Sequence, residues 1–119
     1  MEPAVNAIEA FTLNELTAVI ANASIVISTD SGPFHIAGAL GRPIVGLFRS
    51  HRSQYARLYP GAIVALGQDS RCEGRCGPHY CEVRPCREMQ DLSVSTVMLH
   101  VDRVLLESRA TGKQNQIPS

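Results

Sequence analysis

Two short apolar runs with a helical segment between them constrain the fold of this chain more than any other feature. The runs cover residues 25–27 and 44–48, and each has the composition of a buried strand. Between them, Pro33 suits the first turn of a helix and Gly41 suits the position just after its end. Strand, helix and strand at these lengths predict a right-handed parallel crossover, and therefore an α/β fold whose parallel sheet is covered on both faces.

The flanking segments extend this pattern toward the N-terminus. Thr12 and Glu15 form a capping box, which predicts a helix from residue 13, and Asn22 offers an end for it. Helical spacing predicts that this helix buries one face, made of Leu13, Leu16, Val19 and Ile20. We expect the strand that follows to cover residues 24–28, and a further short strand to cover residues 5–8.

The same reasoning places the later elements. We expect a helix over residues 33–40 and strands over residues 43–48 and 62–66. A last helix would begin at Ser93 or Ser95 and end near Ser108. Its apolar side would consist of Val94, Val97, Met98, Val101, Val104 and Leu105.

The turn between the first of these strands and its helix has the chemistry of an anion site. Backbone N–H groups and the positive end of the helix dipole both point into such a turn. Ser31 offers a hydroxyl, Asp30 can accept hydrogen bonds from sugar hydroxyls, and Gly32 permits a close approach of backbone to ligand. His35 lies one turn along, within reach of the same anion. A structural alternative stays open, in which Ser31 or Asp30 caps the helix and His35 packs against a neighbour.

A polar, basic segment follows the strand over residues 43–48. It contains Arg49, Arg52 and Arg57. A solvated loop is the favoured interpretation of these arginines, ahead of a basic lip whose guanidinium groups bind a diphosphate.

Four cysteines cluster in residues 67–90, a long loop interrupted by proline and glycine. They are Cys72, Cys76, Cys81 and Cys86. Thiolates in such a cluster can hold a structural zinc ion, two disulfides could staple the loop in an oxidising compartment, and free thiols are the third possibility. The spacing lacks a Cys-x2-Cys pair, so the sequence leaves these alternatives open. No histidine and carboxylate stand out to activate a thiol, so no cysteine is assigned a catalytic role.

Length and composition bound the remaining possibilities. The chain has 119 residues and a formal net charge of zero, so it lacks the basic excess of a dedicated nucleic-acid binder. No apolar run is long enough to span a membrane, and the first residues lack the pattern of a signal peptide. These observations predict one small domain over residues 1–109, a disordered tail over residues 110–119 and a cytoplasmic location.

The central motif also resembles a known family. The motif consists of Asp30-Ser31-Gly32-Pro33, His35, Ala37, Ala39-Leu40-Gly41 and Pro43, followed by Gly46-Leu47-Phe48. It is similar to the signature of the ADP-heptose:lipopolysaccharide heptosyltransferases (glycosyltransferase family 9), and roughly residues 8–106 can be laid on the C-terminal part of that family. One departure is Arg49, where family members more often have glycine.

The resemblance implies a partial Rossmann-like domain, the donor-binding half of a GT-B glycosyltransferase, that binds an ADP-sugar for lipopolysaccharide core synthesis. The residues that would line the donor site are Asp30, Ser31, Gly32, Pro33 and His35. In this family the acceptor site and the catalytic carboxylate belong to the other domain, so no catalytic residue is assigned here. The isolated chain is therefore expected to have little transferase activity, since transfer needs donor and acceptor in one geometry.

Two other hypotheses remain beside the donor-binding domain. One is a non-catalytic module that keeps the family's fold, and the other is a small metal-binding protein built around the cysteine loop. In each case a partial domain would leave sheet edge and apolar helix surface uncovered. We therefore expect self-association, most simply as a two-fold dimer.

Overall fold

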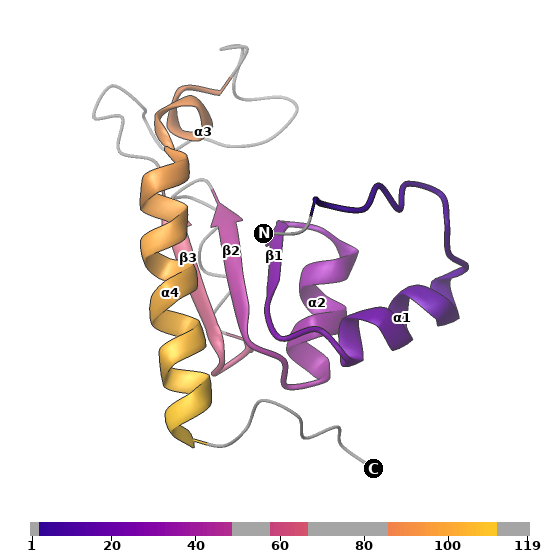
Figure 1. The fold of residues 1–119 in the computed structure, drawn as a ribbon. Coiled ribbons are helices and arrows are strands. Elements are labelled where there is room, and N and C mark those ends of the chain that lie inside the picture. Colours follow the sequence, from indigo (N-terminus) through magenta and orange to yellow (C-terminus); the bar gives the residue numbers. More distant parts are fainter. Residues whose placement is uncertain (1–2, 49–57, 67–85, 112–119) are drawn as a thin grey trace.

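A computed structural model describes residues 3–48, 58–66 and 86–111 of the chain (Figure 1). The elements in chain order are α1 (Leu13–Ala21), β1 (Val26–Thr29), α2 (Gly32–Ala39), β2 (Ile44–Phe48), β3 (Ala62–Leu66), α3 (Arg87–Asp91) and α4 (Val94–Thr111). The three expected strands from residue 24 onward are therefore confirmed, as is the helix between the first two. The short helix α3 overlaps the end of the segment over residues 67–90 that the sequence predicted to be a loop.

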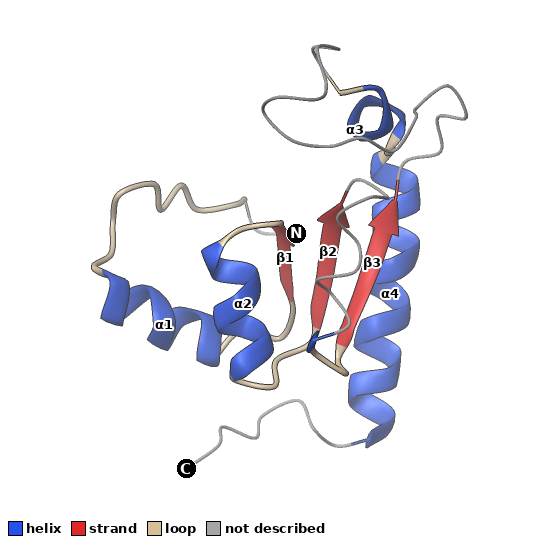
Figure 2. Ribbon diagram, turned by 180° about the vertical axis from the view of Figure 1, so that it is seen from behind, coloured by secondary structure: helices blue, strands red, loops and turns tan. Residues whose placement is uncertain are grey.

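The strands form one parallel sheet in the order β1-β2-β3. Val26 pairs with Ile44, which pairs in turn with Ala62, so the three strands start in register. Helices α2 and α1 lie on one side of the sheet and α4 lies on the other (Figures 1 and 2). The fold is thus the α/β arrangement with a parallel sheet that the strand-helix-strand pattern predicted, and it is Rossmann-like, as the family resemblance implied.

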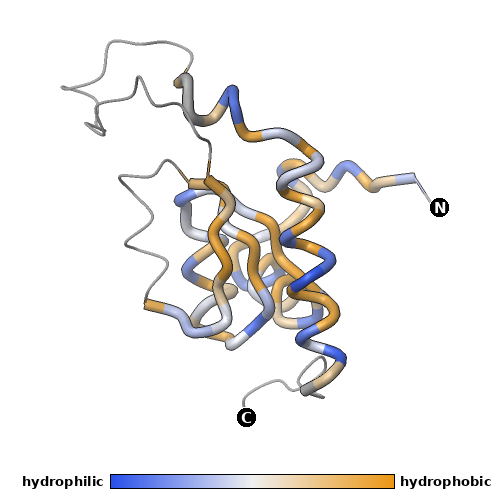
Figure 3. The backbone as a smooth tube through the Cα atoms, turned by 90° about the vertical axis from the view of Figure 1, so that its left-hand side faces the viewer, coloured by the Kyte–Doolittle hydropathy of each residue, from blue (hydrophilic) through white to orange (hydrophobic). Residues whose placement is uncertain are grey.

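Strand β2 lies in the middle and supplies both hydrophobic cores. Ile44 and Phe48 are directed to the α2 side, where they pack with Phe34, Ala37 and Ile20. The core on the α4 side consists of Val45, Ala65, Val101 and Val104. Because side chains alternate along a strand, one short apolar run serves two layers. The tube view shows the strands coloured mostly as hydrophobic (Figure 3).

Strand β1 is only half covered, which corrects the expectation that both faces of the sheet are buried. Helix α4 contacts β2 and β3, and the α4 side of β1 lies beyond it. Ile27 pairs with the fully buried Val45, yet 47% of Ile27 is exposed. Within the described residues, the sheet therefore ends at β1 with an apolar side chain open on one face.

Helix α1 begins as its capping box predicts. The Thr12 hydroxyl accepts a hydrogen bond from the Glu15 N–H at 3.2 Å, and the Glu15 carboxylate accepts one from the Thr12 N–H at 2.9 Å. Asn22 ends the helix, as expected. The predicted apolar face was partly wrong: Ile20 is buried, but Leu13 is 70% exposed and Val19 is 46% exposed. The reason is that α1 packs mainly on α2 and reaches the core beside the sheet through Ile20, so only a narrow stripe is buried.

The strand expected over residues 5–8 is wrong. This segment is exposed coil, in which the Asn6 side chain accepts a hydrogen bond from the Ile8 N–H at 3.0 Å. Glu9 follows with a φ of 59°, in the left-handed region. A local side-chain-to-backbone bond of this kind competes with strand pairing, because it bends the chain into a turn.

Helix α4 extends three residues beyond its expected end near Ser108. Its start is supported by the Ser93 hydroxyl, which accepts a hydrogen bond from the Thr96 N–H at 3.1 Å. Val101 and Val104 are buried as predicted, whereas Val94 and Met98 are exposed. The N-terminal part of α4 extends beyond the end of the sheet. The apolar side of the helix is therefore longer than the sheet surface against which it packs.

Candidate functional site

The predicted anion site lies where β1 ends and α2 begins. Asp30 directly follows β1, Ser31 occupies the N-cap position, and Gly32 and Pro33 are the first residues of the helix. His35 lies one turn further along the same helix. The chain thus brings all five predicted residues to the carboxyl end of β1, the edge where parallel α/β sheets bind their ligands.

The Ser31 side chain does not perform the structural task that the alternative interpretation gave it. Although Ser31 is the N-cap residue, it makes no side-chain cap hydrogen bond. Its hydroxyl instead lies 3.1 Å from the Ser28 hydroxyl and donates to the Thr29 carbonyl at 3.3 Å. The first N–H groups of any helix have no carbonyl partner within it, and here the N-cap hydroxyl does not serve them.

Gly32 is not required by the fold. Only Gly41 among the described glycines has a positive φ, 67°, as expected for a residue that ends a helix. A Cβ placed on Gly32 would meet no described atom within 4 Å. The space in front of the first helical residue is therefore open, and a ligand could approach the backbone there.

His35 makes two polar contacts that lie on opposite sides of its ring. Nδ1 lies 2.8 Å from the Tyr59 hydroxyl oxygen, and Nε2 lies 3.9 Å from Oδ1 of Asp30. The imidazole is 40% exposed and the Asp30 side chain is 25% exposed, so both remain accessible. The structure therefore couples two of the predicted residues and adds Tyr59, which the sequence reasoning missed. Tyr59 lies 24 positions from His35, just before the strand predicted over residues 62–66, and no sequence signal joins the two.

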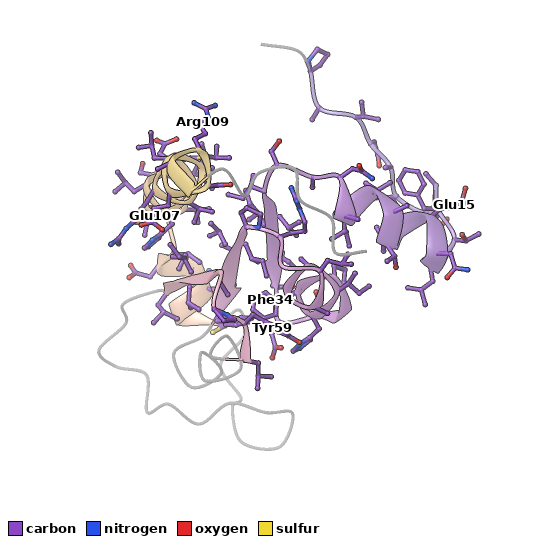
Figure 4. All side chains as sticks on the ribbon, turned by 90° about the horizontal axis from the view of Figure 1, so that it is seen from below. Glu15, Phe34, Tyr59, Glu107 and Arg109 are labelled. Carbon is purple, nitrogen blue, oxygen red and sulfur yellow. The ribbon has the colours of Figure 1, made fainter. Side chains whose placement is uncertain are left out.

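An aromatic cluster holds Tyr59 in place behind the site. Phe34 is fully buried and its ring meets those of Phe48, Tyr59 and His35 edge to face, with centroids 4.9–5.6 Å apart. Figure 4 shows Phe34 and Tyr59 side by side next to α2. The Tyr59 ring packs directly on Gly38. Only the absence of a side chain at Gly38 allows this, because a Cβ there would overlap the ring.

A concavity lies at the edge of the sheet opposite the turn, where β2 and β3 begin. Its volume is about 220 Å³. It is lined by Gly41, Arg42, Pro43, Pro60, Gly61, Ile63, Val104, Glu107 and Ser108. It shares no residue with the turn at Asp30 and is separated from it by the length of α2.

Most of the predicted cysteine site lies outside the described residues, as do Arg49, Arg52 and Arg57. Of the four cysteines, only Cys86 is described: it is a half-buried free thiol at the N-cap position of α3. In the described part of the chain, no three His, Cys, Asp or Glu side chains gather into a group that could hold a metal ion. The described helices also include none that is long and apolar enough to cross a membrane.

Comparison with known proteins connects this geometry to a family. The model of glycosyltransferase family 9 (heptosyltransferase) matches residues 2–84, which include α1, α2 and all three strands. Two curated relatives come from Haemophilus influenzae. Lipooligosaccharide heptosyltransferase 2 is 41% identical over 91 residues, covering 68% of this chain and 26% of the relative. Lipopolysaccharide core heptosyltransferase OpsX is 49% identical over 39 residues, covering 33% of this chain and 11% of the relative.

The chain thus spans about a quarter of the length of the first of these relatives and about a tenth of the second. No solved structure matches the chain. The matched region contains residues 30–35, Tyr59 and the three described strands, and it covers well over half of the chain. The chain therefore belongs to glycosyltransferase family 9, the heptosyltransferase family.

Proposed function

We propose that this chain binds the diphosphate of a nucleotide-diphosphate sugar at the N-terminus of α2, as the donor-binding part of a GT-B heptosyltransferase. The observation that carries the proposal is the open backbone at Gly32, next to a Ser31 hydroxyl that does not cap the helix. A phosphate oxygen placed there would accept hydrogen bonds from first-turn N–H groups at the positive end of the helix dipole.

Each residue of the turn has a separate role in this proposal. Ser31 and the Gly32 backbone hold the phosphates, while Pro33 fixes a φ in the first turn of the helix, where its missing N–H leaves no helical hydrogen bond unmade. His35 adds an N–H donor from the next turn. Asp30 is an anion and would repel phosphate, so it accepts hydrogen bonds from the sugar hydroxyls instead.

The donor that we propose is ADP-heptose, and the process is lipopolysaccharide core synthesis. Support comes from the names of the two relatives, which describe heptosyltransferases of lipopolysaccharide core and lipooligosaccharide. We assign no catalytic residue to this chain, and we expect donor binding without appreciable transfer from the chain alone.

The proposed location is the cytoplasm, which fractionation of cells expressing the tagged chain would test.

Calorimetric titration with ADP and an ADP-sugar tests the proposal. The wild-type chain should bind both, and Ser31→Ala, His35→Ala and Gly32→Ala should each weaken binding. Gly32→Ala is the sharpest variant, since the added methyl group fills only open space and leaves the fold intact. Ser95→Ala and His100→Ala, both on α4, are the matched controls. Failure of the wild-type chain to bind either compound would overturn the proposal.

A structural zinc ion held by Cys72, Cys76, Cys81 and Cys86 is a separate proposal, which rests on the clustering of the four residues in sequence. Metal analysis of the purified chain tests it: one zinc per chain, lost in a Cys86→Ser variant, is the expected result. A metal-free chain with four titratable thiols would show that the cysteines are free.

We further propose that β1 associates with a second copy of the chain. Strand β1 is the edge of the described sheet, and Ile27 is open beside it. A two-fold axis at this edge would pair the two β1 strands antiparallel and join two three-stranded sheets into one. Pairing would satisfy edge hydrogen-bonding groups and cover Ile27.

A further inference from the structure

We infer that Tyr59 is a positioning residue for His35: it fixes the side-chain proton of the neutral imidazole on Nε2, the nitrogen that faces the turn at Asp30. This inference rests on the proposed function in one respect only, which is that the Nε2–H serves a ligand phosphate. The protonation state of the free chain can be measured without any ligand.

The two contacts of the ring decide which nitrogen carries the proton. A neutral imidazole has one N–H donor and one acceptor nitrogen, and the partner of one nitrogen determines the other. A proton on Nδ1 would leave the Nε2 lone pair 3.9 Å from a carboxylate oxygen of Asp30, an unfavourable arrangement of two negative centres. A proton on Nε2 points a positive hydrogen at that carboxylate, while Nδ1 accepts from the Tyr59 hydroxyl at 2.8 Å. The second arrangement is electrostatically favourable at both ends.

Tyr59 can impose this arrangement because its own position is fixed by packing that does not involve the turn. Its ring lies over Gly38, which has no side chain to obstruct it. The ring also meets Phe34 edge to face with centroids 5.6 Å apart, and Phe34 is fully buried. This packing positions the Tyr59 hydroxyl next to His35, and it does so whether or not a ligand is present.

The consequence for binding is preorganisation. A donor that already points into the site loses little freedom when a phosphate oxygen arrives. A histidine free to exchange its proton between the two nitrogens would present a lone pair to the phosphate for part of the time. Asp30 lies 3.9 Å from Nε2, beyond hydrogen-bond distance, so the 2.8 Å contact with the Tyr59 hydroxyl is the stronger of the two contacts and the one that fixes the tautomer.

The experiment is long-range ¹H–¹⁵N correlation of the neutral histidine rings in the full chain without ligand. The wild-type spectrum should show His35 as the Nε2–H tautomer. Tyr59→Phe keeps the aromatic packing and removes only the hydroxyl, so it should convert His35 to a mixture of tautomers. His100, on α4, is the internal control and should not change. His35→Gln assigns the His35 signals.

A wild-type His35 protonated on Nδ1, or a tautomer ratio that Tyr59→Phe leaves unchanged, would overturn the inference.

In the binding assay, Tyr59→Phe should lower the affinity for ADP about two- to tenfold, as expected for one lost hydrogen bond. The same substitution in a His35→Ala background should have no further effect. A further loss there would show that Tyr59 acts directly or through the fold, and would also contradict the inference. Absence of ADP binding in the wild type would refute the proposed function but leave the tautomer result standing.

Discussion

Arg42 donates two hydrogen bonds to one carbonyl oxygen, that of Ala23, from Nε at 3.1 Å and from Nη2 at 2.5 Å. The arginine follows α2 and the alanine follows α1, so this contact joins the ends of the two helices through residues 19 positions apart in sequence. Arg42 is only 2% exposed. The guanidinium is thus deeply buried at the edge of the sheet opposite Asp30, and its contact with Ala23 ties the two helix ends together.

Arg42→Met should lower the free energy of unfolding by about 1–3 kcal/mol, because it leaves a partly buried carbonyl oxygen without its charged donor. Urea denaturation measures the change. Arg103→Met is the matched control: Arg103 pairs with Glu107 on the exposed surface of α4, and its loss should change stability by less than about 1 kcal/mol. Equal effects of the two substitutions would show that the Arg42 contact is not structural.

Ser31→Ala and Thr12→Ala should separate binding from helix capping. Thr12 caps α1 through its hydroxyl, so Thr12→Ala should cost about 1 kcal/mol of stability and leave ADP affinity unchanged. Ser31 makes no cap hydrogen bond, so Ser31→Ala should reduce ADP affinity with little loss of stability. Thermal unfolding measures the stability of each variant, and calorimetric titration measures its affinity for ADP. A large stability loss in Ser31→Ala would restore the structural interpretation of that serine.

Gly38→Ala should destabilise the chain even though alanine favours helices more than glycine does. The added methyl group overlaps the Tyr59 ring, and overpacking of this kind costs about 1–3 kcal/mol. Gly32→Ala, at the other end of the same helix, should be neutral or slightly stabilising. Denaturation curves of the two variants provide the comparison, and a stable Gly38→Ala would mean that Tyr59 is not seated on α2.

The capping box of α1 should weaken in acid. The Thr12 N–H, and after it the Thr12 hydroxyl, lowers the pKa of Glu15 below its ordinary value of 4.5. The folded state therefore releases this proton more readily than the unfolded state. The carboxylate stabilises α1 fully above pH 4.5, and this support is lost as the pH falls through the lowered pKa. The Thr12 amide resonance should move over that interval in the wild type and not in Glu15→Gln.

Ile27→Lys should abolish self-association if β1 is the contact between two copies. Sedimentation velocity over a range of concentrations should show a dimer for the wild type and a monomer for the variant. Thr17→Lys, which places the same charge on α1, is the control. A wild-type chain that remains monomeric at high concentration would contradict the proposed contact.

Local chemistry made α2 and its neighbours predictable. Pro33, Gly41 and the apolar runs each act within a few residues of themselves, and the predicted boundaries differ from the observed ones by no more than two residues. The exposure of Leu13 and Val19 was not predictable in this way. Helical spacing shows which side chains share a face of the helix, but it does not show how much of that face a neighbouring element covers. The missing strand at residues 5–8 has the same cause, since strand formation depends on a partner that composition does not reveal.

The same distinction between local and long-range interactions applies to the candidate site. The residues from Asp30 to His35 are adjacent in sequence, so a motif could identify them. Tyr59 reaches His35 only because α2 folds back across the sheet and Gly38 leaves room beside it. A contact made by the fold between distant segments carries no local signature.

The middle position of β2 has a consequence for how the chain opens. Its amides are bonded on both sides, and Ile44, Val45 and Phe48 are almost completely shielded from water. Hydrogen exchange at β2 should therefore require unfolding of the whole chain. Strand β1, bonded on one side, can detach at lower free energy and carry the Asp30 turn with it. A ligand that bridges the turn and α2 would close this weaker unit, and its arrival would be visible as slowed exchange at β1 while β2 stays the same.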